Sequence, residues 1–160
     1  MAFRTFTEKE TKRLDELAES FRELVLPVIH QINALCKDED CSAHIISGYR
    51  STQKQQQLYK KGRKLHNGRW RRTGEPVVTH AKPGQSAHEY RLAVDVGLLK
   101  HSNRHWIDDS DERWHTIIGR VVSKTKLTWG GGFRSLFDPA HIEDPNWREV
   151  ASELGWRGLQ

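Results

Sequence analysis

The sequence predicts a single α+β domain in which helices flank a small, mostly antiparallel sheet. Segments with helical and strand-like patterns alternate along the 160 residues, but they show no βαβ rhythm and no internal repeat. No linker rich in Gly, Ser or Pro divides the chain. A domain of this length buries about two thirds of its unfolded surface, so it needs neither disulfides nor a metal merely to fold.

The first expected element is one long amphipathic helix over about residues 8–35. Thr7 and Glu10 form a capping-box pattern at its start. Apolar residues then recur at helical spacing, at Leu14, Leu17, Phe21, Leu24, Val25, Val28, Ile32 and Leu35.

A strand, a helix and a basic loop are expected next. Residues 43–49 predict a strand that ends near Gly48, and a glutamine-rich helix then runs over 51–59 and ends at Gly62. Residues 62–76 combine five Arg or Lys residues with glycines and show little apolar periodicity, which predicts an exposed loop. A tryptophan in this loop either stacks on a sugar or base or packs against the protein surface.

The second half of the chain predicts shorter elements. Strands are expected at 77–79, 92–99, 126–129 and 141–143, with a glycine bend at 130–132, an amphipathic helix at 106–122, and a C-terminal helix at about 146–155. Asn146 is the expected cap of the last helix.

The chain is basic, with 26 Lys and Arg against 21 Asp and Glu, a formal charge of +5 and a pI near 9.4. This charge favours encounter with anionic polymers, such as nucleic acid or bacterial wall, but does not choose between them. The first ten residues have no apolar core of a secretory signal, and no stretch approaches the ~18 apolar residues of a membrane span. We therefore expect synthesis in the cytoplasm without a signal peptide. Cys36 and Cys41 are expected to be two reduced thiols, although their C-x4-C spacing also allows a disulfide or a share in a metal site.

Three residues have the types and spacing of a zinc site: His88, Asp95 and His141. Hydrolytic zinc sites use three protein ligands at about 2.0–2.2 Å and leave a fourth position for water. A straight strand would separate His88 from Asp95 by about 23 Å, and a helix would separate them by about 10 Å. The chain must therefore turn back near residues 89–91. The other histidines are expected to be ordinary surface or core residues, except that His80, which lies close in sequence to this site, is a candidate to support it.

Asp138 lies three residues before His141 and is the candidate proton acceptor. A carboxylate beside a zinc site can take a proton from water and deliver it to a leaving amine. The alternative is that Asp138 and Pro139 simply form a turn.

These motifs resemble the VanY and endolysin group of zinc peptidases, the M15 peptidases, over about residues 47–143. The resemblance is carried by Ser86, His88 and Asp95, by Asp138 and His141, and by the segments 47–51 and 129–131. Within this group the chain is most similar to the L-alanyl-D-glutamate endopeptidases of bacteriophage endolysins.

The resemblance implies one zinc peptidase domain over 1–160, with the fold shared by hedgehog domains and D-Ala-D-Ala peptidases. It implies zinc held by His88, Asp95 and His141, and Asp138 as general base. Arg50 would bind or polarise the substrate near the scissile carbonyl, a role that suits a guanidinium. Gln55 and Ser86 lie where the family tends to keep polar residues.

Two residues depart from the family pattern. Arg91 stands where a glycine is expected, and a positive φ there would cost of order 1 kcal/mol. Asp138 stands where members that cleave D-Ala-D-Ala have glutamate, which favours the L-Ala-D-Glu branch.

The expected function is therefore zinc-dependent hydrolysis of the L-alanyl-D-glutamate bond in peptidoglycan by a phage-type endolysin. We expect a monomer that acts on the cell wall after membrane permeabilisation and binds no nucleic acid. The alternatives are a D-Ala-D-Ala carboxypeptidase, a zinc-containing binding domain like those of hedgehog proteins, and a nucleic-acid binder that uses residues 62–76.

Overall fold

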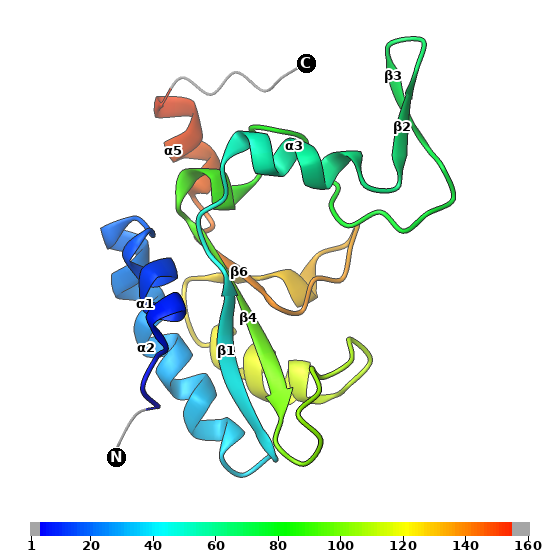
Figure 1. The fold of residues 1–160 in the computed structure, drawn as a ribbon. Helices are drawn as coiled ribbons and strands as arrows, with labels where there is room; N and C mark the ends of the chain where they lie inside the picture. The colour runs from blue at the N-terminus through cyan, green and yellow to red at the C-terminus, as the bar shows by residue number, and fades with distance from the viewer. Residues whose placement is uncertain (1–3, 155–160) are drawn as a thin grey trace.

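Four antiparallel strands form the main sheet of the protein, which the computed structural model describes over residues 4–154 (Figure 1). Their spatial order is β1 (Cys41–Ser47), β4 (Ala93–Lys100), β6 (His141–Glu143) and β5 (Thr128–Trp129). The predicted fold class, a mixed α and β domain with a small antiparallel sheet, is confirmed. β5 has only two of the four residues expected for it.

Two helices, α1 (Glu8–Asp15) and α2 (Glu19–Cys36), contact β1 (Figure 1). The apolar side of α2 supplies much of the core, where it joins the buried side chains of β1 and β4. Its fully buried members include Phe21, Val25, Ile29 and Ile32. Burial of this kind contributes about 1.5–3 kcal/mol per large apolar side chain, so the packing of α2 is a main source of stability.

The prediction of one helix over residues 8–35 was wrong, because the helix breaks between Asp15 and Glu19. Ala18 is extended there, with φ −58° and ψ 136°, and its N–H donates to the backbone oxygen of Arg91 at 3.0 Å. The Arg91 guanidinium donates to the backbone oxygen of Glu16 at 2.6 Å. Contacts with a distant segment thus replace helical hydrogen bonds, and the break contains neither Gly nor Pro that would predict it.

The prediction of an exposed loop over residues 62–76 was also wrong. After α3 (Thr52–Lys60), the chain forms a two-stranded antiparallel sheet of β2 (Arg63–His66) and β3 (Arg69–Arg72). Asn67 and Gly68 connect the strands, and both have positive φ, as in a type I′ turn. The hairpin extends away from the main sheet beyond the end of α3 (Figure 1).

Two further predicted elements differ in the structure. Residues 77–79 form no strand, and the helix expected at 106–122 begins only near residue 113. Trp106 instead pairs with Leu99 of β4, and its ring lies over Gly97, where an added Cβ would approach the ring to 2.8 Å. The first residues of the expected helix therefore pack against β4 instead of forming helical turns.

The remaining helical segments pack against other helical segments. A π-helical turn (Trp114–Gly119) continues into α4 (Arg120–Val122), and both contact α2. α5 (Trp147–Glu153) follows β6, with Asn146 at the N-cap position but without a capping side-chain hydrogen bond. Residue 155, the expected end of this helix, lies outside the described residues. No helix within residues 4–154 is long and apolar enough to span a membrane.

Candidate metal centre and cleft

Three different elements bring His88, Asp95 and His141 together. His88 lies on a 3₁₀ turn (Ala87–Tyr90), whereas Asp95 and His141 lie directly opposite each other on β4 and β6. The expected reversal occurs at Arg91, which has φ 64° and ψ 25°. This turn lets the 3₁₀ segment fold back over the start of β4.

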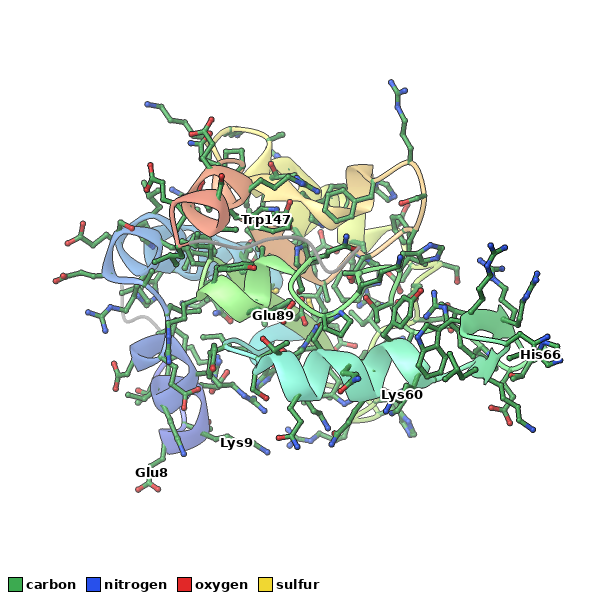
Figure 2. The ribbon with its side chains drawn as sticks, turned by 90° about the horizontal axis from the view of Figure 1, so that it is seen from above. Glu8, Lys9, Lys60, His66, Glu89 and Trp147 are labelled. Atoms are coloured by element: carbon green, nitrogen blue, oxygen red, sulfur yellow. The ribbon has the colours of Figure 1, made fainter. Side chains whose placement is uncertain are left out.

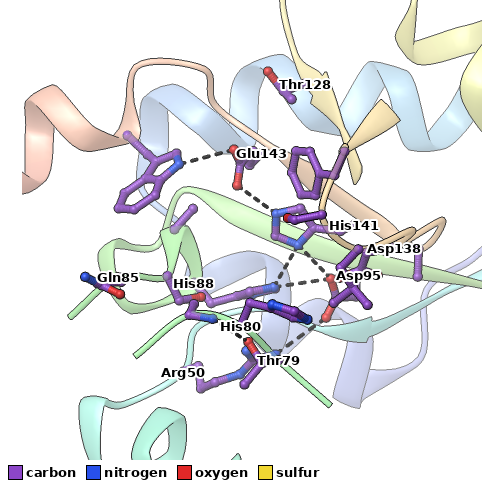
Figure 3. A pocket seen from close by; sticks show the side chains of 18 of the residues that line it. Arg50, Thr79, His80, Gln85, His88, Asp95, Thr128, Asp138, His141 and Glu143 are labelled. Atoms are coloured by element: carbon purple, nitrogen blue, oxygen red, sulfur yellow. Dashed lines mark hydrogen bonds and ion pairs between the residues drawn. The ribbon is translucent and has the colours of Figure 1, made fainter. Parts of the chain in front are cut away.

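The donor atoms of the three residues form a small triangle (Figure 3). His88 Nε2 lies 3.2 Å from Asp95 Oδ1 and 3.2 Å from His141 Nδ1, and His141 Nδ1 lies 3.1 Å from Asp95 Oδ1. Two imidazoles and one carboxylate at this separation are a suitable donor set for a divalent metal ion, and for zinc in particular.

The outer hydrogen bonds of the histidines test whether a metal fits. His88 Nδ1 lies 2.7 Å from the backbone oxygen of Gly48, and His141 Nε2 lies 2.8 Å from Glu143 Oε2. Both partners only accept, so these two ring nitrogens carry the protons. In the neutral rings, Nε2 of His88 and Nδ1 of His141 then direct lone pairs toward each other and toward Asp95. Such an arrangement is repulsive by itself and is satisfied by a cation, so the residues fit a metal ion.

The electrostatics of the cluster favour positive charge at the same point. Burial opposes ionisation of Asp95, but His88 and His141 outweigh it and lower the pKa of Asp95 well below its ordinary value. Burial likewise opposes protonation of His141, but hydrogen bonds to Asp95 and Glu143 raise the pKa of His141 to about 10. The field that attracts a proton here also attracts a metal cation.

Glu143 is a site residue that the sequence interpretation missed. It is buried on β6, accepts from His141, and also accepts from the indole N–H of Trp147 at 3.2 Å. The available signal was the strand alternation that puts residues 141 and 143 on one face. A carboxylate in that position sets the tautomer of the histidine.

Asp138 lies near Asp95 in the same cleft (Figure 3). Its backbone is held by two hydrogen bonds of 3.2 Å, from its own N–H to the oxygen of Gly130 and from the N–H of His141 to its oxygen. A Cβ at Gly130 would clash with the Asp138 backbone and lie 2.8 Å from His141 Cβ. Burial and the charge of Asp95 raise the pKa of Asp138, as suits a group that exchanges protons.

Arg50 approaches the cluster from the segment between β1 and α3. Its guanidinium lies 3.6 Å from Asp95 Oδ2, and it donates to the buried side chain of Gln55 at 2.9 Å. Gln55 in turn donates to the backbone oxygen of Ala81 at 2.8 Å. The structure therefore places Gln55 behind Arg50, where it holds the guanidinium in position.

The cluster opens into a cleft of about 1030 Å³. Ser86 and His80, the other two residues singled out in the sequence, line this cleft together with Arg50 and Asp138. The outer ring nitrogens of His88 and His141 bond to Gly48 and Glu143, not to His80. Ser86 is buried where it lines the cleft, whereas His80 is exposed, and a contact of either residue with substrate stays a prediction.

An open cleft with a His-Asp-His cluster and an adjacent carboxylate is typical of metallohydrolases. The profile of the family described as "VanY: D-alanyl-D-alanine carboxypeptidase" matches residues 18–119, which is more than half of the chain. The chain therefore belongs to the VanY family of M15 peptidases, which act on peptidoglycan.

Three known proteins are similar to this chain in sequence or in fold. The peptidoglycan L-alanyl-D-glutamate endopeptidase CwlK of Bacillus subtilis is 27% identical over 128 residues, which cover 73% of this chain and 71% of CwlK. The crystal structure of the L-Ala D-Glu endopeptidase ChiX of Serratia marcescens superposes with a TM-score of 0.55 at 17% identity, covering 91% of this chain and 92% of ChiX. A zinc complex of the D,D-pentapeptidase VanY superposes with a TM-score of 0.48 at 18% identity, covering 89% and 80%.

Proposed function

We propose that the protein is a zinc-dependent endopeptidase that hydrolyses the L-alanyl-D-glutamate bond of peptidoglycan stem peptides. The observation that carries this proposal is the triangle of donor atoms in an open cleft, with the protonated ring nitrogens turned outward. The likeness to CwlK supports the choice of bond.

His88, Asp95 and His141 are the proposed ligands of the zinc ion. A zinc ion with three protein ligands supplies Lewis-acid activation of a water molecule and of the scissile carbonyl. Gly48 and Glu143 contribute from outside by keeping both histidines in the tautomer that a metal requires.

Asp138 is the proposed general base and acid. It accepts a proton from the attacking water and returns this proton to the departing amine, so no covalent intermediate with the chain is needed. Arg50, held by Gln55, offers charged donors to the negative oxygen that develops from the scissile carbonyl.

The second candidate is a D-Ala-D-Ala carboxypeptidase, which the description of the matching family favours. The two activities share the metal centre and differ in the peptide that the cleft accepts. Asp138, in place of the glutamate expected for D-Ala-D-Ala cleavage, supports the endopeptidase.

Mass spectrometry of fragments released from purified peptidoglycan tests the proposal. Zinc-loaded protein is expected to release stems with a new N-terminal D-Glu, and chelator-treated protein is expected to release none. Free D-alanine as the product would instead establish the carboxypeptidase, and no cleavage of several wall types would favour a binding domain.

We also propose a role in phage-type lysis, with the monomeric protein made in the cytoplasm and reaching the wall once the membrane is permeabilised. The resemblance to endolysin endopeptidases supports this role. Bacteria that express the protein internally are expected to lyse only after a membrane permeabiliser is added. Lysis without a permeabiliser would contradict the proposal.

A further inference from the structure

The net positive charge of the chain resides in the β2–β3 hairpin. Residues 63–72 contain five Arg or Lys residues and no acidic residue. Without these five, the 26 basic residues of the chain fall to 21, equal to its 21 acidic residues. The nearest acidic residues in the sequence are Asp40 and Glu75, and within residues 4–154 Glu75 forms no ion pair with the hairpin.

The pairing of the hairpin places like charges opposite each other. Arg63 pairs with Arg72, Lys64 pairs with Arg71, and the fourth pair joins His66 to Arg69. Like charges at opposed positions destabilise an antiparallel pair, and an isolated two-stranded hairpin is only marginally stable. Within residues 4–154, none of the ion pairs involves these five cations. The hairpin thus keeps a repulsion that an external anion would relieve.

The two faces of the hairpin have different partners. Strand alternation puts Leu65 and Trp70 on one face, where Trp70 meets the ring of Tyr59 with centroids 6.2 Å apart. Lys64, Arg69 and Arg71 share the other face with His66, which lies at the far end of the hairpin (Figure 2). This second face, defined here as the cationic face, is exposed throughout.

The base of the hairpin is joined to the wall of the cleft. The Arg63 guanidinium lies over the ring of Tyr59 at 4.0 Å and donates to the backbone oxygens of Tyr59 at 2.7 Å and Thr79 at 3.0 Å. Thr79 lines the cleft and also contacts Gln55, the partner of Arg50. A ligand on the hairpin would therefore be held next to the substrate cleft.

We propose that the cationic face binds a phosphodiester polymer attached to the peptidoglycan and so holds the cleft against its substrate. Two of the three Arg or Lys residues on this face, Arg69 and Arg71, are arginines, whose planar guanidinium groups bind phosphate through paired hydrogen bonds. A row of cations along a strand pair matches a polymer with repeated charges better than it matches a single anion. The choice of a wall polymer rests on the proposed function.

The test compares the triple variant K64Q/R69Q/R71Q with K9Q/K12Q/K124Q, which removes three exposed lysines elsewhere. Both changes lower the formal net charge from +5 to +2, so they separate position from total charge. Binding on ice is measured to wall sacculi before and after hydrofluoric acid removes their phosphodiester polymers. A soluble stem peptide reports catalysis independently, and melting temperature reports folding.

The hairpin variant is expected to bind untreated sacculi roughly tenfold more weakly than the natural chain, with a shallower dependence on salt, while the control variant binds normally. All three proteins are expected to cleave the soluble peptide equally. The proposal would be overturned if the natural chain bound stripped sacculi as tightly as untreated ones. It would also be overturned if the hairpin variant and the control variant lost the same amount of binding. Tighter retention on anionic phospholipid vesicles or duplex DNA than on walls would also overturn it. Failure of the natural chain to cleave any peptide would count against the proposed function alone.

Discussion

The carboxylate of Glu143 decides which nitrogen of His141 faces the cluster. Replacing Glu143 by Gln keeps its size but removes the charge that fixes the proton on Nε2. We expect zinc affinity to fall by about 10- to 100-fold, measured by competition with a chromophoric chelator. The exposed Glu149 on the following helix provides the matched control, Glu149→Gln. Equal affinities of the two variants would contradict this role.

Asp138 differs from the cluster residues because its proposed role is proton transfer. The Asp138→Asn variant should therefore keep its zinc and lose activity by about 10²- to 10⁴-fold, measured as kcat on a stem peptide together with metal content. Asp38→Asn, at an exposed position beyond α2, is the control. If Asp138→Asn lost zinc along with activity, the residue would belong to the metal centre instead.

Arg91 shows why a glycine position can hold a long side chain. Its φ of 64° carries a backbone cost, while its guanidinium lies 4.0 Å from the ring of Tyr49 and donates to Glu16. Arg91→Ala loses these side-chain contacts but keeps the backbone strain of the positive φ. Arg91→Gly loses the same contacts but removes the strain. We expect the alanine variant to be less stable than the glycine variant by about 1 kcal/mol in urea unfolding. The reverse order would show that the turn is not strained.

At the scale of elements, Glu10 connects α1 to β1. It completes the predicted capping box with Thr7, accepts from the N–H of Ile45 at 3.0 Å, and pairs with Arg4. Burial opposes its ionisation, but these hydrogen bonds outweigh it and lower the pKa of Glu10 to about 2.

A lowered pKa in the folded state stabilises the protein above the unfolded value of 4.5, and this stability is lost as pH falls from there toward 2. We expect Glu10→Gln to lower the free energy of unfolding by at most about 3 kcal/mol at pH 7 and to flatten its dependence on pH between these values. Urea titrations at several pH values measure both effects. If the free energy of unfolding of Glu10→Gln fell with acid as steeply as that of the natural chain, the lowered pKa of Glu10 would not be the cause of this pH dependence.

Local patterns predicted some elements well and missed others for physical reasons. Spacing of residue types identified the cluster of His88, Asp95 and His141, and chain geometry required the turn that Arg91 makes. The break after α1 depends on hydrogen bonds from a segment 75 residues away, which local periodicity does not contain. The Asn67-Gly68 pair is typical of a β-hairpin turn, but the many cationic residues around it are typical of an exposed loop.

In the molecule as a whole, the apolar core and the cluster of His88, Asp95 and His141 stabilise different parts of the fold. The core joins α2 to the sheet, while the cluster joins the 3₁₀ turn to β4 and β6. We expect chelation to lower the melting temperature while far-UV circular dichroism at 25 °C stays unchanged. Loss of the dichroism signal on chelation would show that the metal is required for folding.

We propose that His88, Asp95 and His141 hold one zinc ion, with a fourth position left open toward the cleft. X-ray absorption at the zinc edge of the loaded protein measures these ligands. We predict one zinc per chain with two imidazole nitrogens and oxygen ligands, all at about 2.0–2.2 Å. Sulfur at about 2.3 Å would contradict the claim, because it would assign the metal to the buried thiols of Cys36 and Cys41.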